Sequence, residues 1–225
     1  MLTYPAVIAL DVNETLSDMS PLAARLEETG APGHLLATWF ASTLRDGFAL
    51  TAAGAYANFE AVAQAALRSI LSDTPTVTGE PGEAAEFVLA GMNELSLHPD
   101  VQPGLKRLHA AGVRLVALSN GRRSSVEQLL ERGGVSKVVE QCLSVEEVRR
   151  WKPASEPYRY AVDRCGVAPE QMMLVATHPW DTDGAKRAGL AAGWINRSAI
   201  SYPDPLRAPD LICSDFGELA DALSG

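Results

Sequence analysis

The sequence predicts an α/β protein in which a helical insertion interrupts a parallel sheet early in the chain. Short apolar runs that end in polar residues occur at residues 6–10, 113–118 and 172–176, as expected for buried strands that lead into loops. From residue 103 onward such runs alternate with helical patterns, which is typical of the strand–helix–strand units of a parallel sheet. Between these parts the pattern is helical alone.

The helical block follows the first strand directly. Ser20 is expected to cap its first helix, with Pro21 as the first helical residue and Gly30 at the end. Apolar side chains that recur with helical spacing predict further helices over residues 36–44, 56–70 and 83–95. We therefore expect a core domain of residues 1–16 and 98–225 and a helical cap domain of residues 17–97.

From residue 103 onward, the remaining elements are predicted where the pattern of apolar residues changes between that of a helix and that of a strand. In chain order we expect a helix at 104–111, a strand at 113–118, a helix at 124–132, a strand at 141–144, a helix at 155–165, a strand at 172–176, a helix at 184–188, strands at 192–195 and 211–213, and a helix at 217–223.

Length and charge limit the possible functions. The 225 residues suit one compact core with a modest insertion, and the net charge of -9 argues against nucleic acid as a partner. Cys142, Cys165 and Cys213 are scattered and are expected to be buried free thiols rather than metal ligands. Neither a leader sequence nor a membrane-spanning run is evident, so we expect a cytoplasmic protein with no membrane partner.

Polar residues follow three of the predicted strands. Asp11 comes directly after the first, Ser119 and Asn120 follow the second, and a segment with His178 and Asp181 follows the strand at 172–176. Because the carboxyl ends of parallel strands meet at one edge of a sheet, these side chains should converge there. An isolated aspartate would more often be a turn residue. Together the segments predict a functional site.

A fourth segment, Trp151-Lys152-Pro153, adds a cation. Alone it would be an exposed lysine before a turn proline. In their order and spacing the four segments resemble those of the haloacid dehalogenase superfamily over essentially the whole chain, and in particular its L-2-haloacid dehalogenase (type II) branch. The resemblance implies a Rossmann-like, HAD-like parallel core with a helical cap, and a homodimer.

The resemblance also implies an activity. This is the hydrolysis of short 2-haloalkanoic acids by water to 2-hydroxy acids, without metal or cofactor, through an aspartyl ester formed on Asp11. Lys152 would keep Asp11 ionised, because a nearby ammonium favours the charged carboxylate. By its place in the motif, Asp181 would orient Lys152 and the hydrolytic water, and Ser119 would hold the substrate carboxylate. The expected substrate-binding residues are Val12, Asn13, Thr15, Asn120 and Tyr158.

Two positions separate this chain from phosphate-ester hydrolases of the superfamily. Those enzymes typically carry a second aspartate as acid and base where this chain has Asn13, and an acidic Mg²⁺ ligand where it has Thr177. An amide cannot shuttle protons, and losing a carboxylate weakens a Mg²⁺ site. A halide, in contrast, leaves without a proton.

The expected leaving-group pocket departs from the family pattern. The family commonly places an arginine after a cap-helix tryptophan, whereas Trp39 is followed here by Phe40. Arg45 is a candidate replacement for the missing charge. His178 stands where the family has asparagine, and a protonated histidine beside Trp180 would stabilise a hard anion, which extends the expected substrates to fluoroacetate.

Two alternatives remain at this point. One is a Mg²⁺-dependent phosphohydrolase of the same superfamily, which Asn13 and Thr177 disfavour. The other is a non-catalytic binder of small carboxylates that has kept the fold. The departures at Phe40 and His178 keep the second alternative open, whereas the joint presence of Asp11, Ser119, Lys152 and Asp181 argues against it.

Overall fold

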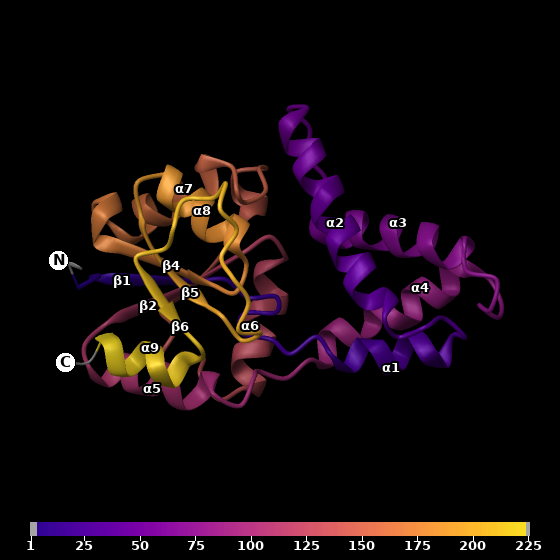
Figure 1. Cartoon of the computed structure of the whole chain (residues 1–225), viewed down its shortest axis with the longest axis horizontal. Coiled ribbons are helices and arrows are strands. Elements are labelled where there is room, and N and C mark those ends of the chain that lie inside the picture. Colours follow the sequence, from indigo (N-terminus) through magenta and orange to yellow (C-terminus); the bar gives the residue numbers. More distant parts are fainter. Residues whose placement is uncertain (1–3, 224–225) are drawn as a thin grey trace. The chain divides into compact units, whose positions relative to one another are not determined.

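The chain folds into two compact units, seen in a computed structural model that describes residues 4–223 (Figure 1). One unit consists of Met1–Ser17 and Ser96–Gly225, and the other of Asp18–Leu95. We call them the core unit and the cap unit. The expected α/β fold with a parallel sheet is confirmed.

The core unit is built on a fully parallel sheet of six strands within the described residues. In the order β3-β2-β1-β4-β5-β6, its strands are β1 Val7–Leu10, β2 Arg114–Ser119, β3 Gln141–Ser144, β4 Met172–Ala176, β5 Ala191–Ile195 and β6 Leu211–Cys213. Strand β1 lies between β2 and β4, so the connections diverge there in opposite directions along the sheet. Such a switch point opens a crevice at the carboxyl ends of the strands.

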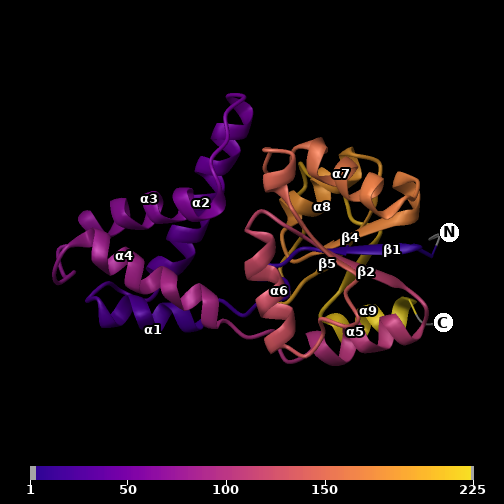
Figure 2. The same ribbon diagram turned by 180° about the vertical axis from the view of Figure 1, so that it is seen from behind.

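Helices cover both faces of the sheet, as Figures 1 and 2 show from opposite sides. One face packs against α5 (Val101–Ala110), α6 (Arg123–Arg132) and α9 (Phe216–Leu223), and the other against α7 (Ser155–Cys165) and α8 (Pro179–Arg187). Two short 3₁₀ helices, η2 (Val145–Glu147) and η3 (Pro169–Gln171), precede α7 and β4. Because both faces are covered, β1 and β4 are buried along their whole length, which explains their uninterrupted apolar sequences.

The cap unit is helical. It contains α1 (Pro21–Glu28), α2 (Leu35–Ala52), α3 (Phe59–Ser72), α4 (Pro81–Ala90) and the 3₁₀ helix η1 (Gly91–Glu94). The Trp39 indole donates to the Ala63 carbonyl and joins α2 to α3, while Arg25 of α1 donates to the Phe87 carbonyl of α4. Within residues 4–223, no helix combines the length and apolar character that a membrane span requires.

Helix α1 starts at Pro21 after Ser20, as predicted, whereas the predicted start of α8 is wrong. Ser20 makes no side-chain cap bond; the Asp18 carboxylate instead accepts from the Ser20 amide. Helix α8 begins at Pro179 rather than near Gly184, because proline at the first position needs no amide partner there. Asp183 is therefore inside the helix, where it pairs with Arg187.

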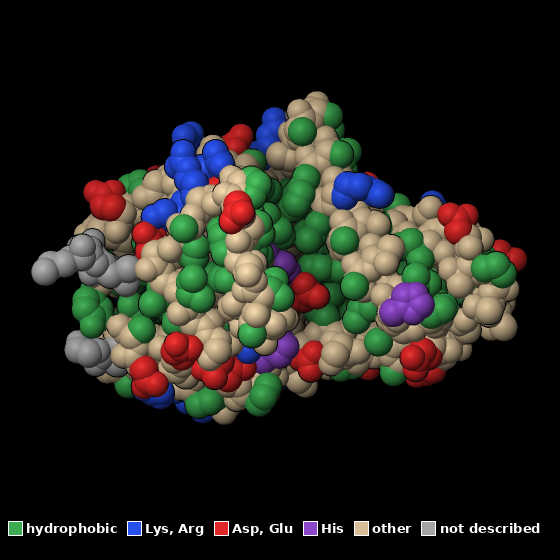
Figure 3. Space-filling model, viewed as in Figure 1, with side chains coloured by type: hydrophobic (Ala, Val, Ile, Leu, Met, Phe, Trp, Pro, Cys, Tyr) green, Lys and Arg blue, Asp and Glu red, His purple; other side chains and the backbone are tan. Residues whose placement is uncertain are grey.

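Surface charge is spread over both units. On the face shown in Figure 3, acidic side chains are scattered rather than gathered in one patch. The chain has a net charge of -9, and the face shown has no broad basic surface.

Helices α5 and α9 cross closely at Gly104. A Cβ atom there would lie 2.5 Å from Cβ and 2.6 Å from the carbonyl oxygen of Phe216. Alanine in a helix normally gains about 0.5–1 kcal/mol over glycine, but this overlap reverses the sign. We expect Gly104→Ala to lower the free energy of unfolding by about 1–3 kcal/mol in urea titrations. The exposed Lys106→Ala on the same helix should stay within about 0.5 kcal/mol of wild type; equal effects of the two changes would contradict the packing argument.

Candidate active site

Asp11 lies at the carboxyl end of β1 with its backbone and side chain both fixed. Its amide donates to the Val175 carbonyl at 3.0 Å, which places it beside the end of β4. The Thr15 hydroxyl donates to Asp11 Oδ2 at 2.6 Å and accepts from the Thr177 amide at 2.9 Å. Because the Thr15 hydroxyl oxygen accepts a hydrogen bond from the Thr177 amide, the hydroxyl proton is the one that is donated to Asp11.

Lys152 brings a buried ammonium group to the same carboxylate. Its Nζ atom lies 2.7 Å from Asp11 Oδ1, 2.7 Å from Asp181 Oδ2 and 2.9 Å from the Leu118 carbonyl oxygen. All three protons of the ammonium thus have acceptors. The side chain is completely buried, so its charge persists only because both carboxylates surround it.

Asp181 stands in the first turn of α8 and is held from two sides. Lys152 donates to Oδ2, and the Tyr158 hydroxyl of α7 donates to Oδ1 at 2.6 Å. Burial raises the pKa of Asp181; Lys152 opposes this rise, and the nearby charge of Asp11 adds to it. Burial next to Asp181 raises the pKa of Tyr158 well above its ordinary value, so the phenol keeps its proton as a donor.

The charges decide the ionisation of Asp11 and Lys152. Burial alone would raise the pKa of Asp11, but Lys152 and His178 outweigh it and lower the pKa well below the ordinary range. Burial would lower the pKa of Lys152, but the two carboxylates raise it above its ordinary value. At neutral pH the site therefore holds an ionised aspartate next to a charged lysine, as an attacking carboxylate requires.

Asn120 and Ser119 line the end of β2. The Asn120 side-chain oxygen accepts from the Lys152 amide at 2.9 Å, which ties the Lys152 loop to the sheet. Ser119 Oγ accepts from the Gly121 amide at 2.9 Å, and both side chains are buried. On the loop after β1, the Val12 carbonyl accepts from the amides of Leu16 and Ser17, and Asn13 is half-buried.

His178 is placed between two carboxylates. Its Nδ1 atom lies 3.3 Å from Asp11 Oδ2, and its Nε2 atom lies 2.8 Å from Glu14 Oε2. Its ring stacks on Trp180, with centroids 5.2 Å apart. Burial would lower the pKa of His178, but the hydrogen bonds to Asp11 and Glu14 raise it to about 9.

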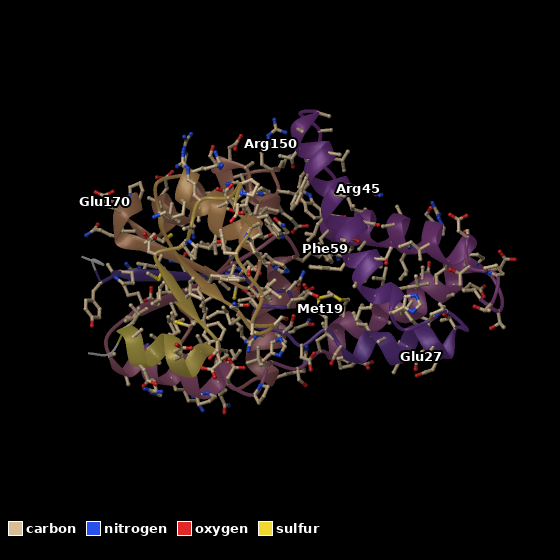
Figure 4. The ribbon with its side chains drawn as sticks, viewed as in Figure 1. Met19, Glu27, Arg45, Phe59, Arg150 and Glu170 are labelled. Carbon is tan, nitrogen blue, oxygen red and sulfur yellow. The ribbon has the colours of Figure 1, made fainter. Side chains whose placement is uncertain are left out.

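The core unit thus brings together eleven of the thirteen predicted site residues at the carboxyl ends of β1, β2 and β4. Phe40 and Arg45 belong to the cap unit. Phe40 is buried, with its ring 6.3 Å from that of Trp39. Arg45, labelled on α2 in Figure 4, is exposed and pairs with Asp46.

Two residues that contact the predicted site were missed. Glu14 lies three residues after Asp11, but only the folded chain shows its contact with His178. Arg197 follows β5 and donates to the Thr15 carbonyl at 3.0 Å and to Asp100 at 2.9 Å. Its place just after a parallel strand was a usable signal. Within residues 4–223, no three His, Cys, Asp or Glu side chains are grouped so as to hold a metal ion.

The chain is similar in sequence to haloacid dehalogenases. Residues 5–189 match the model of the haloacid dehalogenase-like hydrolases. The chain is 27% identical over 219 residues to (S)-2-haloacid dehalogenase H-109 of Pseudomonas putida, with 96% of each chain covered. It is 31% identical over 168 residues to (S)-2-haloacid dehalogenase 1 of Pseudomonas sp. strain CBS-3, covering 75% of this chain and 73% of the relative.

A solved structure extends the comparison to three dimensions. The crystal structure of the L-2-haloacid dehalogenase RSc1362 superposes with a TM-score of 0.91 at 27% identity, over 99% of this chain and all of the other. The likeness therefore includes both units of the chain.

Removing the buried cation should destabilise the protein in a pH-dependent way. Lys152→Met leaves Asp181 without a cation and Asp11 with His178 alone, which we expect to cost about 3–5 kcal/mol at pH 7. In wild type the pKa of Asp11 is lowered, so its contribution to stability is lost as the pH falls through the acidic range. In the variant, burial and the charge of Asp11 raise the pKa of Asp181 with no cation to oppose them, so the contribution of Asp181 to stability is instead gained as the pH falls. Urea unfolding should therefore show a smaller deficit at pH 5 than at pH 7.

Lys186→Met is the matched control, because Lys186 pairs with Asp210 at a half-exposed site. We expect it to cost less than about 1 kcal/mol at either pH. A deficit of Lys152→Met that stays constant from pH 7 to pH 5 would show that lost packing, rather than uncompensated charge, is responsible.

Proposed function

The chain belongs to the haloacid dehalogenase-like hydrolases, and we propose that it hydrolyses the carbon–halogen bond of short 2-haloalkanoic acids to yield 2-hydroxy acids. The observation that carries the proposal is the Asp11 carboxylate, held ionised by a buried lysine 2.7 Å away at a sheet edge whose residue 13 is an amide. Such a carboxylate is a nucleophile suited to a leaving group that departs without a proton from residue 13.

The reaction that we propose has two steps. One Asp11 oxygen attacks the carbon that bears the halogen, the carbon–halogen bond breaks, and halide leaves with the bonding electrons. Water then attacks the carbonyl carbon of the resulting aspartyl ester and releases the 2-hydroxy acid. The first step needs no proton, because halides are weak bases.

Lys152 and Asp181 serve both steps in this proposal. Lys152 keeps Asp11 ionised before the attack and stabilises negative charge on its carboxyl group during ester hydrolysis. Asp181, oriented by Tyr158, fixes Lys152 and receives a proton from the hydrolytic water. We propose that neither step uses a metal ion, since Lys152 supplies the positive charge beside the nucleophile.

The substrate carboxylate needs neutral hydrogen-bond donors, because the cations Lys152 and His178 are already engaged with Asp11, Asp181 and Glu14. We propose the Ser119 hydroxyl and the loop amides of Val12 and Asn13 for this role, with Asn120 lining the pocket. Phe40, Arg45 and Trp180 remain proposed parts of the leaving-group pocket. We also propose a homodimer, which sedimentation velocity would test.

The phosphohydrolase alternative receives less support. It requires an aspartate as acid and base two residues after Asp11 and a carboxylate ligand for Mg²⁺ at residue 177, whereas residue 13 is an amide and Thr177 donates its hydroxyl to the Ile195 carbonyl. A non-catalytic carboxylate binder would have no use for a fully buried lysine between two carboxylates, which is costly to maintain.

Halide release tests the proposal directly. In the presence of chelator we expect release from chloroacetate, bromoacetate, fluoroacetate and one enantiomer of 2-chloropropionate. Asp11→Asn should abolish release by removing the attacking oxygen anion, while the protein stays folded by circular dichroism. Asp163→Asn, an exposed aspartate on α7, should keep the wild-type rate.

The opposite outcomes are as informative. Phosphate release from a phosphate ester only with added Mg²⁺ would replace this proposal by the phosphohydrolase alternative. Substrate binding without any turnover would favour the binder.

A further inference from the structure

Glu14 adopts a backbone conformation that its residue type disfavours. Its φ angle is 60°, in the left-handed region where a residue with a Cβ costs roughly 1–2 kcal/mol. The Glu14 carbonyl oxygen lies 3.1 Å from His98 Nε2, and this contact helps to hold the turn. The conformation sends the carboxylate to His178 Nε2 at 2.8 Å. A strained residue at a functional loop is a reason to look for a role.

His178 joins Glu14 to the nucleophile. Carboxylates only accept hydrogen bonds, and His178 faces one from each ring nitrogen, Asp11 Oδ2 at Nδ1 and Glu14 Oε2 at Nε2. Only the imidazolium form donates from both nitrogens. The three residues therefore form a chain in which a positive ring carries a proton beside Asp11.

The geometry of the first reaction step keeps the His178 proton away from the departing halide. In a displacement at carbon, the halide departs on the side opposite the attacking oxygen. A donor in contact with the Asp11 carboxylate itself lies on the attacking side, with the reacting carbon between it and the halide. His178 is therefore badly placed to stabilise a departing halide, although the sequence suggested that role.

The second step, in contrast, needs a proton at this position. When Oδ2 has formed the ester bond, Oδ1 is the carbonyl oxygen and Lys152 lies 2.7 Å from it to stabilise the developing oxyanion. The bond between Cγ and Oδ2 must then break, and the electron pair goes to Oδ2, an alkoxide that is far more basic than a halide. The His178 ring faces Oδ2.

We propose that His178 is the general acid that protonates the departing 2-hydroxy acid, and that Glu14 is the positioning residue that keeps His178 in place and charged. This inference rests on the proposed dehalogenase function and deepens it. Water adds hydroxide to Cγ and gives one proton to Asp181. The Cγ–Oδ2 bond breaks as His178 gives its proton to Oδ2. Asp181 and the new Asp11 carboxyl group then each lose a proton. One of these two protons restores the charged form of His178, and the other leaves to solvent.

The charged groups that face His178 support a proton at neutral pH. They are Asp11 and Glu14 from the loop after β1, with Lys152 and Asp181 beyond Asp11. The two facing carboxylates hold the pKa of His178 at about 9. In the ester only Glu14 still faces the ring as a carboxylate, so we expect ester hydrolysis to slow as the pH rises, with its alkaline limb below about 9.

The test separates the two half-reactions in His178→Asn and Glu14→Gln, with bromoacetate and chloroacetate in rapid mixing and intact-mass measurement. We expect a burst of about one halide per site at the wild-type rate, then turnover slowed about 10²–10⁴-fold in His178→Asn and less in Glu14→Gln. The carboxymethyl ester on Asp11 should accumulate, and the slow rate should be the same for both halogens. The alkaline limb of Glu14→Gln should shift to lower pH.

Glu14→Gly guards against misfolding as an explanation, because it relieves the backbone strain and still removes the carboxylate; it should behave like Glu14→Gln. A slowed burst, with a larger defect for chloride than for bromide and no ester, would place His178 at the halide and overturn the proposal. If the wild-type protein releases no halide and forms no ester, the dehalogenase function itself fails and this role falls with it.

Discussion

The site depends on one ammonium group that is enclosed by protein. Lys152 is fully buried, and its charge is tolerable only because Asp11, Asp181 and the Leu118 carbonyl accept all three of its protons. These acceptors come from the ends of three adjacent strands or the helix that follows one, so the sheet must be correctly assembled before the lysine is satisfied. The ionised state of Asp11, on which its proposed role as nucleophile depends, therefore requires the correct register of β1, β2 and β4.

Much of this arrangement was predictable from local sequence. Strands buried on both faces have uninterrupted apolar sequences, and polar residues directly after them must meet at one edge of a parallel sheet. Asp11, Ser119 and Asp181 were found in this way, and the match to known motifs added Lys152. What local sequence lacks is the direction of a side chain. Nothing near Glu14 shows that a left-handed turn sends it to His178, which is 164 residues away along the chain. Helix α8 starts five residues before the predicted start near Gly184, because Pro179 is its first residue.

The charges at the site are nearly balanced before any substrate arrives. Asp11, Asp181 and Glu14 contribute three negative charges, and Lys152 and His178 contribute two positive ones. An anionic substrate meets a net charge close to neutral rather than a strongly repelling one, even though the whole chain carries -9. Without a charged His178 the same carboxylates would repel an anionic substrate more strongly, so the charge that we propose on the ring would favour binding as well as the proposed proton transfer.

Contacts within the core unit hold together the two points where the chain leaves it and returns to it. Ser17 pairs with Leu97 in an isolated bridge, the His98 amide donates to the Leu16 carbonyl, and Arg197 clasps Thr15 and Asp100. The two ends of the inserted segment are thus pinned side by side by the core itself. Closing a loop whose ends are already adjacent costs free energy that grows only slowly with its length. The core unit can therefore accept inserted segments of different length at this point while Asp11 keeps its place at the end of β1.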